Sequence, residues 1–259
     1  MTERSHVELE LRDGAAWITL CDGDRGNAVS SALVDDLHAA VARARRERAR
    51  VVVLRSTGRF FSVGGDIGAF ADVPDVASYV DDLADALHRV VAELQRMPAV
   101  VVSVVQGMAA GAGFPLAAAA DVVLAGRSAK FTLGYSRIGF SVDGGTSLLV
   151  HSLGLHRVLR LALLNDVLTA DEAFACGLVA RVHDDDALAE EAENLVASLL
   201  AGSAGAMAAT KRLVRDTADA APERALEAET RSIRERADSA DGREGVRAFL
   251  DKRAPRFGG

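Results

Sequence analysis

Two apolar runs, each followed by a glycine-rich turn, constrain the fold of this chain more than any other feature. The runs Val51–Leu54 and Ala99–Val105 are dominated by valine, which is typical of strands buried on both faces of a parallel sheet. The turn Phe61–Asp66 follows the first run, and the turn Gly107–Gly113 follows the second. Ligands of open α/β folds bind at the carboxyl edge of the sheet. We therefore expect both turns to lie at a ligand site.

The rest of the first half of the chain predicts further strands and two long helices. Alternating apolar residues on either side of Asp13-Gly14 predict a β-hairpin, because this dipeptide favours a two-residue turn. Apolar residues at helical spacing predict one helix from about Ser30 and another over residues 76–96. Two short strands are expected further on, at Val122–Ala125 and Lys130–Thr132.

The last third of the chain is expected to be helical throughout. From Ser147 onward apolar residues recur at helical spacing, and helix starts are marked at Thr169, Asp186, Ser203 and Pro222. Strands in the first half and helices in the last third favour a layered α/β core with a helical C-terminal region. We place the core at residues 1–200 and the helical region, which we expect to make oligomer contacts, at residues 201–259.

Composition argues against several classes of function. The chain has 37 acidic and 30 basic residues, whereas nucleic-acid binding needs a basic surface, so we expect no nucleic-acid partner. Cys21 and Cys176 lie far apart and outside any metal-ligand spacing, so we expect buried structural thiols and no metal site. A polar N-terminus and the lack of an apolar run of spanning length predict a cytoplasmic protein without membrane contact.

Backbone amides are the chemistry that the two glycine-rich turns offer. Small residues let a ligand approach the backbone closely, and N–H groups at the end of a strand can hold a developing oxyanion. The alternative is that the glycines serve only tight turns or close packing. Nucleotide binding is not indicated, because GMAAGAG lacks the dinucleotide-binding spacing and the chain has no P-loop motif.

Together with other segments, the two turns resemble the crotonase superfamily, the enoyl-CoA hydratases and isomerases. The matching segments follow the family order across nearly the whole chain: RGNAVS at Arg25–Ser30, RFFSVGGDI at Arg59–Ile67, PAVVVSVVQGMAAGAGFPLAAAAD at Pro98–Asp121, GRSAKF at Gly126–Phe131, GFSVDGGTS at Gly139–Ser147, LTADEAFACGLV at Leu168–Val179 and EGVRAFLDKRAPRF at Glu244–Phe257. The resemblance implies a crotonase-like ββα spiral core with a helical C-terminal oligomerisation region. It also implies an acyl-CoA thioester as substrate, no separate cofactor, since coenzyme A is part of the substrate, and a homotrimer or a dimer of trimers.

The resemblance further implies roles for single residues. The backbone amides of Gly65 and Ala112 would hold the thioester oxygen, although the family usually has glycine at the second position. Lys252 resembles a lysine that reaches coenzyme A, sometimes from a neighbouring subunit. The lysine common after the aspartate of the first turn is Gly68 here, so one contact with coenzyme A is missing. The remaining residues implied at the coenzyme A pocket are Asn27, Ala28, Asp66 and Ile67.

Carboxylates decide which reaction such a site can carry out. Typical hydratases of the family place two glutamates over the substrate, and the matching positions are Pro115 and Tyr135, which argues against that mechanism. Asp143 resembles the single aspartate of isomerase-like members. The residues alone leave Asp143 open between a helix N-cap and a proton carrier. With the resemblance we interpret Asp143 as the catalytic acid and base of an enoyl-CoA isomerase.

Two other functions stay open. A hydratase or related lyase could use Asp143 with water held by the backbone or by Tyr135. Tyr135 could also bind the substrate as a hydrogen-bond donor, and the alternative for it is a packing role. An acyl-CoA-binding protein that has lost catalysis would also keep the turns and lack the glutamates. We further interpret His88 as a helix-surface histidine and Asp121 as structural, and we expect residues 73–79 to form part of the acyl pocket wall.

Overall fold

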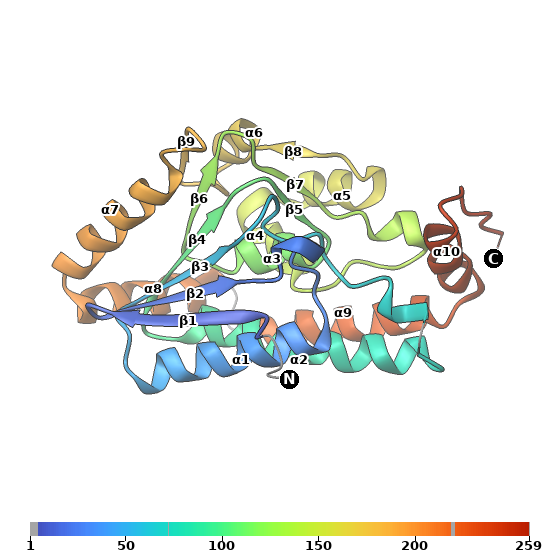
Figure 1. Ribbon diagram of the computed structural model, residues 1–259, viewed down its shortest axis with the longest axis horizontal. Coiled ribbons are helices and arrows are strands. Elements are labelled where there is room, and N and C mark those ends of the chain that lie inside the picture. Colours follow the sequence, from blue (N-terminus) through green and yellow to red (C-terminus); the bar gives the residue numbers. More distant parts are fainter. Residues whose placement is uncertain (1–4, 72, 219–220, 259) are drawn as a thin grey trace.

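A six-stranded sheet lies at the centre of the computed structural model, which describes residues 5–71, 73–218 and 221–258 (Figure 1). The strand order is β1-β2-β3-β4-β6-β9, with β1 antiparallel to β2 and each other neighbouring pair parallel. Because β3 and β4 are parallel neighbours, the turns that follow them meet at one edge of the sheet, as expected. The strands span Val7–Arg12 (β1), Ala15–Leu20 (β2), Val51–Ser56 (β3), Val100–Val105 (β4), Val122–Gly126 (β6) and Arg181–His183 (β9).

Alternating residues of the strands pack into two separate apolar cores, one on each face of the sheet. Ile18 of β2 packs in the core shared with α1 (Ser31–Arg46) and α2 (Val76–Arg96). The adjacent Trp17 packs in the core shared with α7 (Leu188–Ala201). Figure 1 shows α1 and α2 along the lower side of the sheet and α7 at its upper left. Cover on both faces is why the central strands are apolar at nearly every position.

One C-terminal helix extends the layer formed by α1 and α2. Helix α9 (Pro222–Ala237) runs beside α2, and its Ile233 packs with Val80 and Ala84 in a third apolar cluster. The proposed boundary at residue 200 stays a prediction. The other helices span Gly113–Ala118 (α3), Val150–Leu153 (α4), Leu155–Leu164 (α5), Ala170–Ala175 (α6), Ala204–Ala218 (α8) and Ala240–Leu250 (α10).

Three short strands depart from the sequence-based prediction. Met108–Ala110, expected as part of a turn that opens a helix, is strand β5, which pairs with β7 (Lys130–Thr132). Strand β7 pairs in turn with β8 (Leu168–Thr169), and both β8 and β9 lie where only helices were expected. Strands of two or three residues are too short to show a period, so their pairing depends on neighbouring segments.

The longer elements agree with the prediction. The hairpin turns at Asp13 and Gly14, which both have positive φ, and α2 has the expected bounds. The side chain of Ser30 accepts a hydrogen bond from the Leu33 amide and caps α1. Regular period and cap chemistry are therefore sufficient signals for these elements.

Two further expectations concern thiols and the membrane. Cys21 and Cys176 are half-buried rather than buried, and they form no disulfide within the described chain. Over residues 5–71, 73–218 and 221–258, no helix is long and apolar enough to cross a membrane.

Candidate active site

A cavity of about 500 Å³ opens between the two glycine-rich turns, α2 and the loops that follow β7. Gly65, Ala112 and Asp143 all line it. Its wall is mainly apolar and includes the stacked rings of Phe70 and Phe140, so it suits an apolar ligand with a few polar atoms. The part formed by α2 lies beyond the expected residues 73–79, because it consists of Val80, Leu83, Ala84 and Leu87.

The two glycine-rich turns are in direct contact. The amide of Ala110 donates to the carbonyl of Ser62 at 2.8 Å. Gly64 has a φ of +90°, and a Cβ atom there would lie 2.9 Å from the Ala110 carbonyl oxygen. A Cβ atom on Gly113 would lie 2.5 Å from Cβ of Ser62. Close packing therefore requires these glycines, so the packing role left open by the sequence is present at the ligand site itself.

Among the described turn residues that line the cavity, two have a backbone amide without an acceptor. The amide of Gly64 donates to the Ser62 hydroxyl, and the amide of Asp66 donates to the Val29 carbonyl. The amide of Gly111 donates to the Thr132 carbonyl. No such partner is present for the amides of Gly65 and Ala112, within the part of the chain that the structure describes. Both residues line the cavity, so their N–H groups can bind an oxygen atom of a ligand.

The residues implied at the coenzyme A pocket lie in different places. Ala28, Asp66 and Ile67 line the cavity, and Asp66 pairs with Arg25 at 2.8 Å. The Asn27 side chain is buried and donates to the carbonyls of Thr57 and Phe60, so it braces the loop behind the cavity. Lys252 is exposed after α10 and is not among the described residues that line the cavity.

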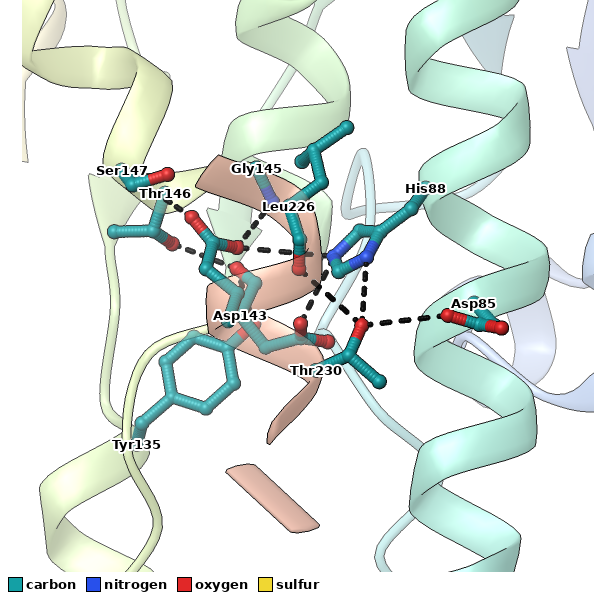
Figure 2. Close-up of polar contacts among 10 residues, drawn as sticks. Asp85, His88, Tyr135, Asp143, Gly145, Thr146, Ser147, Leu226 and Thr230 are labelled. Carbon is teal, nitrogen blue, oxygen red and sulfur yellow. Dashed lines mark hydrogen bonds and ion pairs between the residues drawn. The ribbon is translucent and has the colours of Figure 1, made fainter. Parts of the chain in front are cut away.

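Asp143 is buried beside the second turn. A Cβ atom on the next residue, Gly144, would lie 3.2 Å from Cα of Ala112, so the two segments touch. The Asp143 carbonyl accepts hydrogen bonds from the Tyr135 hydroxyl at 3.1 Å and the Thr146 hydroxyl at 2.7 Å. Its carboxylate instead forms an ion pair with His88, in which Oδ1 lies 2.9 Å from Nε2 (Figure 2).

Glu229 of α9 takes the capping role that the sequence left open for Asp143. Its carboxylate accepts hydrogen bonds from the amides of Gly145, at 2.7 Å, and of Ser147. These amides begin the 3₁₀ helix Thr146–Leu149, whose first N–H groups need acceptors. The sequence contains no local signal for this cap, because Glu229 lies 84 positions from Gly145 along the chain.

The interpretation of His88 as a surface residue is wrong. The residue is 6% exposed and faces α9, where its Nδ1 lies 3.0 Å from the Thr230 hydroxyl. A signal for its burial is present in the sequence, because His88 lies at helical spacing from the buried Ala84 and Val91. The helix has buried faces toward both α1 and α9, so a single apolar stripe does not describe it.

Burial and charge together set the protonation of this cluster. Burial alone would lower the pKa of His88, but the contact with Asp143 and the charges of Asp143 and Glu229 raise it above its ordinary value. Burial raises the pKa of Glu229, and the charge of Asp143 adds to this, whereas the bonds from Ser147 and Gly145 limit the rise. Burial, with the charges of Asp143 and Glu229, raises the pKa of the Tyr135 phenol well above its usual range.

The same three side chains come close enough to bind a metal ion. Ligand atoms of His88, Asp143 and Glu229 lie within 4.8 Å of one another. Both oxygens of Glu229 already accept backbone amides, and His88 already pairs with Asp143. A metal ion would have to displace these contacts, so the arrangement fits an internally paired cluster better.

Comparisons with known proteins agree with the fold. The model of the enoyl-CoA hydratase/isomerase family matches residues 10–259. The chain therefore belongs to the enoyl-CoA hydratase/isomerase family, the crotonase superfamily, whose members act on acyl-CoA thioesters. The mixed α/β core and the helical C-terminal region are the fold of this family.

Several relatives and solved structures are similar over nearly their full length. The chain is 34% identical to 1,2-epoxyphenylacetyl-CoA isomerase of Escherichia coli, with 98% of this chain and 97% of the relative covered. It is 36% identical to a probable enoyl-CoA hydratase of Rhodobacter capsulatus, with 98% of each covered. The crystal structure of an enoyl-CoA hydratase from Mycobacterium avium subsp. paratuberculosis is similar with a TM-score of 0.89 and 33% identity, covering 98% of this chain and 99% of that one.

Proposed function

We propose that this enzyme is an enoyl-CoA isomerase that moves a double bond along an acyl chain, with Asp143 as the acid and base. The observation that carries the proposal is that Asp143 is the one buried carboxylate among the described residues lining the cavity. Hydration with two carboxylates needs a second such group, whereas a double-bond shift needs only one.

The other ionisable side chains of the cavity wall already have partners. Asp66 pairs with Arg25, and Arg137 donates to the Asn165 carbonyl. The Tyr135 hydroxyl donates to the carbonyl of Asp143, and its raised pKa keeps the phenol neutral. These contacts leave the Asp143 carboxylate as the group best placed to carry a proton.

The proposed reaction is balanced without a cofactor. Asp143 takes the proton from C2 of a 3-enoyl thioester, and the electron pair moves through the chain to give a dienolate with its negative charge on the thioester oxygen. The amides of Gly65 and Ala112 form the oxyanion hole that stabilises this oxygen. Asp143 then returns the proton to C4, so that the double bond lies between C2 and C3. The reverse reaction uses the same steps.

Named relatives support the coarser function and are divided on the finer one. Two carry isomerase names: the 1,2-epoxyphenylacetyl-CoA isomerase, and trans-2-decenoyl-[acyl-carrier-protein] isomerase of Streptococcus mutans, which is 29% identical with 98% of each chain covered. The Rhodobacter relative and the 2,3-dehydroadipyl-CoA hydratase of E. coli carry hydratase names. The cavity chemistry, rather than the names, is the reason for choosing the isomerase.

The decisive experiment follows a 3-enoyl-CoA in water enriched in ¹⁸O and, separately, in deuterium oxide. We expect conversion to the conjugated 2-enoyl thioester, seen by its ultraviolet absorbance, with deuterium exchange at C2 and C4 and no ¹⁸O in the product. Asp143→Asn should abolish both conversion and exchange while the thioester still binds. Oxygen-18 in a 3-hydroxyacyl product would instead support a hydratase, and normal turnover by Asp143→Asn would exclude the proposed role.

We also propose that the chain assembles as a trimer, or as a dimer of trimers. Support comes from the large apolar side chains that α5 exposes at Leu155, Leu159 and Leu163, because a stable interface would cover them. In such an assembly Lys252 of one subunit would reach the coenzyme A bound to another. Light scattering after size-exclusion chromatography tests the assembly, and a monomer at micromolar concentration would contradict it.

A further inference from the structure

His88 lies at the centre of a buried polar cluster between α2, α9 and the loop that carries Asp143. Its side chain is 7% exposed, and it is not among the described residues lining the cavity. Figure 2 shows one ring nitrogen in contact with Asp143 and the other in contact with Thr230. A residue in this position acts on the substrate only through Asp143.

The surroundings of the ring suit a proton on each nitrogen. The Thr230 hydroxyl has one proton, and two groups near it can only accept: the Leu226 carbonyl at 3.3 Å and the Asp85 carboxylate at 3.5 Å. With its proton given to one of these, the Thr230 oxygen accepts from Nδ1 of His88 at 3.0 Å. The other nitrogen, Nε2, faces two carboxylates, Asp143 at 2.9 Å and Glu229 at 3.7 Å. Acceptors on both sides of the ring therefore favour the doubly protonated imidazolium.

The two oxygens of the Asp143 carboxylate are not equivalent. Oδ1 contacts His88 and is sealed from solvent. Asp143 nevertheless lines the cavity, so Oδ2 is the atom that a bound thioester can reach. Rotation of the carboxylate would exchange the two oxygens, and among the described residues the ion pair with His88 is the contact that holds Oδ1 in place.

We infer that His88 is a positioning residue, an imidazolium that fixes Oδ1 of Asp143 and leaves Oδ2 as the oxygen that carries the proton. Glu229 and Thr230 hold His88 in turn, and Glu229 is itself held by the amides of Gly145 and Ser147. The inference rests on the proposed role of Asp143 in its catalytic part, whereas the charge and pairing of His88 can be measured without any activity.

The first test measures the charge of His88 directly. In protein labelled with ¹⁵N-histidine, both ring nitrogens of His88 should show imidazolium shifts at pH 7, and the titration midpoint of His88 should lie above that of free histidine. Asp143→Asn should lower that midpoint, although Glu229 and Asp85 still face the cluster. A neutral His88 at pH 7, or a midpoint unchanged by Asp143→Asn, would overturn the inference whatever the enzyme catalyses.

The second test measures turnover in His88 variants. His88→Leu removes both N–H groups at similar volume, and His88→Gln keeps an N–H donor without charge. We expect kcat to fall about 100-fold in His88→Leu with KM nearly unchanged, because a displaced catalytic group loses rate of that order. His88→Gln should recover part of the loss, and the fall of kcat at alkaline pH that accompanies deprotonation of His88 should be absent from it.

Two matched variants separate positioning from stability. Thr230→Val removes the partner of Nδ1 and should lower kcat several-fold, whereas Thr217→Val, which removes a similar hydroxyl from α8, should leave kcat unchanged. Wild-type kcat in both His88 variants would overturn the inference. If wild-type protein exchanges no substrate proton at all, the proposed isomerase function fails, and the charge measurement still decides the pairing of His88 and Asp143.

Discussion

Two carboxylates, the half-buried Asp121 and the buried Asp143, each pair with a cation whose side chain is 7% exposed, yet only Asp143 lies at the cavity. Asp121 contacts Lys211 at 2.8 Å and Arg215 at 2.7 Å, and its Oδ2 also accepts from the amide of Val101. Lys211 donates to two backbone carbonyls besides. In this cluster both carboxylate oxygens have partners. Asp121 therefore ties α8 to β4 and to the end of α3, in agreement with its predicted structural role.

The Asp143 cluster differs in one carboxylate oxygen and in the balance of its charges. It places one histidine between two carboxylates, whereas the Asp121 cluster places one carboxylate between two cations. Oδ2 of Asp143 is left for a ligand, whereas Asp121 has no oxygen to spare. Burial lowers the pKa of Lys211, and the charge of Asp121 offsets only part of this lowering. His88, which lies between two carboxylates, has a raised pKa instead. A buried ion pair is thus weak evidence of function by itself. What distinguishes Asp143 is an open oxygen, a cavity and two nearby amides without acceptors.

The largest expected effect separates these two aspartates. Asp143→Asn should reduce turnover by at least about 1000-fold, within the range of general acid–base catalysis. Asp121→Asn should keep turnover within about threefold but lower the free energy of unfolding by about 3 kcal/mol, because it leaves Lys211 buried without its carboxylate. Steady-state kinetics and denaturant unfolding of both variants test this. Equal losses of turnover would mean that the two clusters do not differ in function.

A second prediction concerns the amides rather than the side chains. Ala112 has a φ of −62°, which proline also adopts, so Ala112→Pro can remove the N–H group with little change of backbone. We expect kcat to fall about 100- to 1000-fold. Ala112→Gly keeps the N–H group and is the matched control, with kcat expected within about threefold of wild type. Similar kcat in both variants would exclude this amide from the oxyanion hole.

How far the sequence predicts this site depends on how far apart along the chain the contacting residues lie. The hairpin, α2 and the two turns after β3 and β4 are predictable because period and turn chemistry are local. Asp143 stands out through the GFSVDGG segment, which resembles a family pattern. Glu229 has no such signal, because its contact with Gly145 and Ser147 forms where α9 packs against the 3₁₀ helix Thr146–Leu149.

His88 shows an intermediate case. Its spacing from Ala84 and Val91 indicates a buried position, but a helix pattern cannot say that the partner is a carboxylate. Short strands such as β5 are also beyond prediction, since three residues carry too little pattern. Sequence reasoning therefore locates the turns and Asp143, and the structure is needed for the groups that hold its carboxylate.

A third prediction compares the two cations through pH. His88 has a raised pKa in the folded chain, with Asp143, Glu229 and Asp85 facing it, so its stabilising contribution is complete below its unfolded value of about 6.5. That contribution is lost as the pH rises through the folded pKa, and the raised pKa of Glu229 acts in the same direction. The free energy of unfolding should therefore decline above about pH 6.5, less steeply in His88→Gln. Lys211→Met should lower stability without altering this decline near neutral pH, and an equal decline in His88→Gln would contradict the prediction.

The smallest expected effect concerns Tyr135, whose role differs between the proposed isomerase and the alternative hydratase. Its hydroxyl donates to the Asp143 carbonyl, which also accepts from Thr146, so Tyr135→Phe leaves that carbonyl with a partner. We expect a loss of about 1 kcal/mol in unfolding free energy and less than a threefold change in kcat. The control is Tyr79→Phe, because Tyr79 is the other of the two tyrosines and is not among the described cavity-lining residues. A loss of kcat above about tenfold in Tyr135→Phe alone would place the phenol in the chemistry. That result would favour a hydratase in which Tyr135 holds water. Asp143 would then no longer be the one ionisable group of the described cavity wall that is left to act on a ligand.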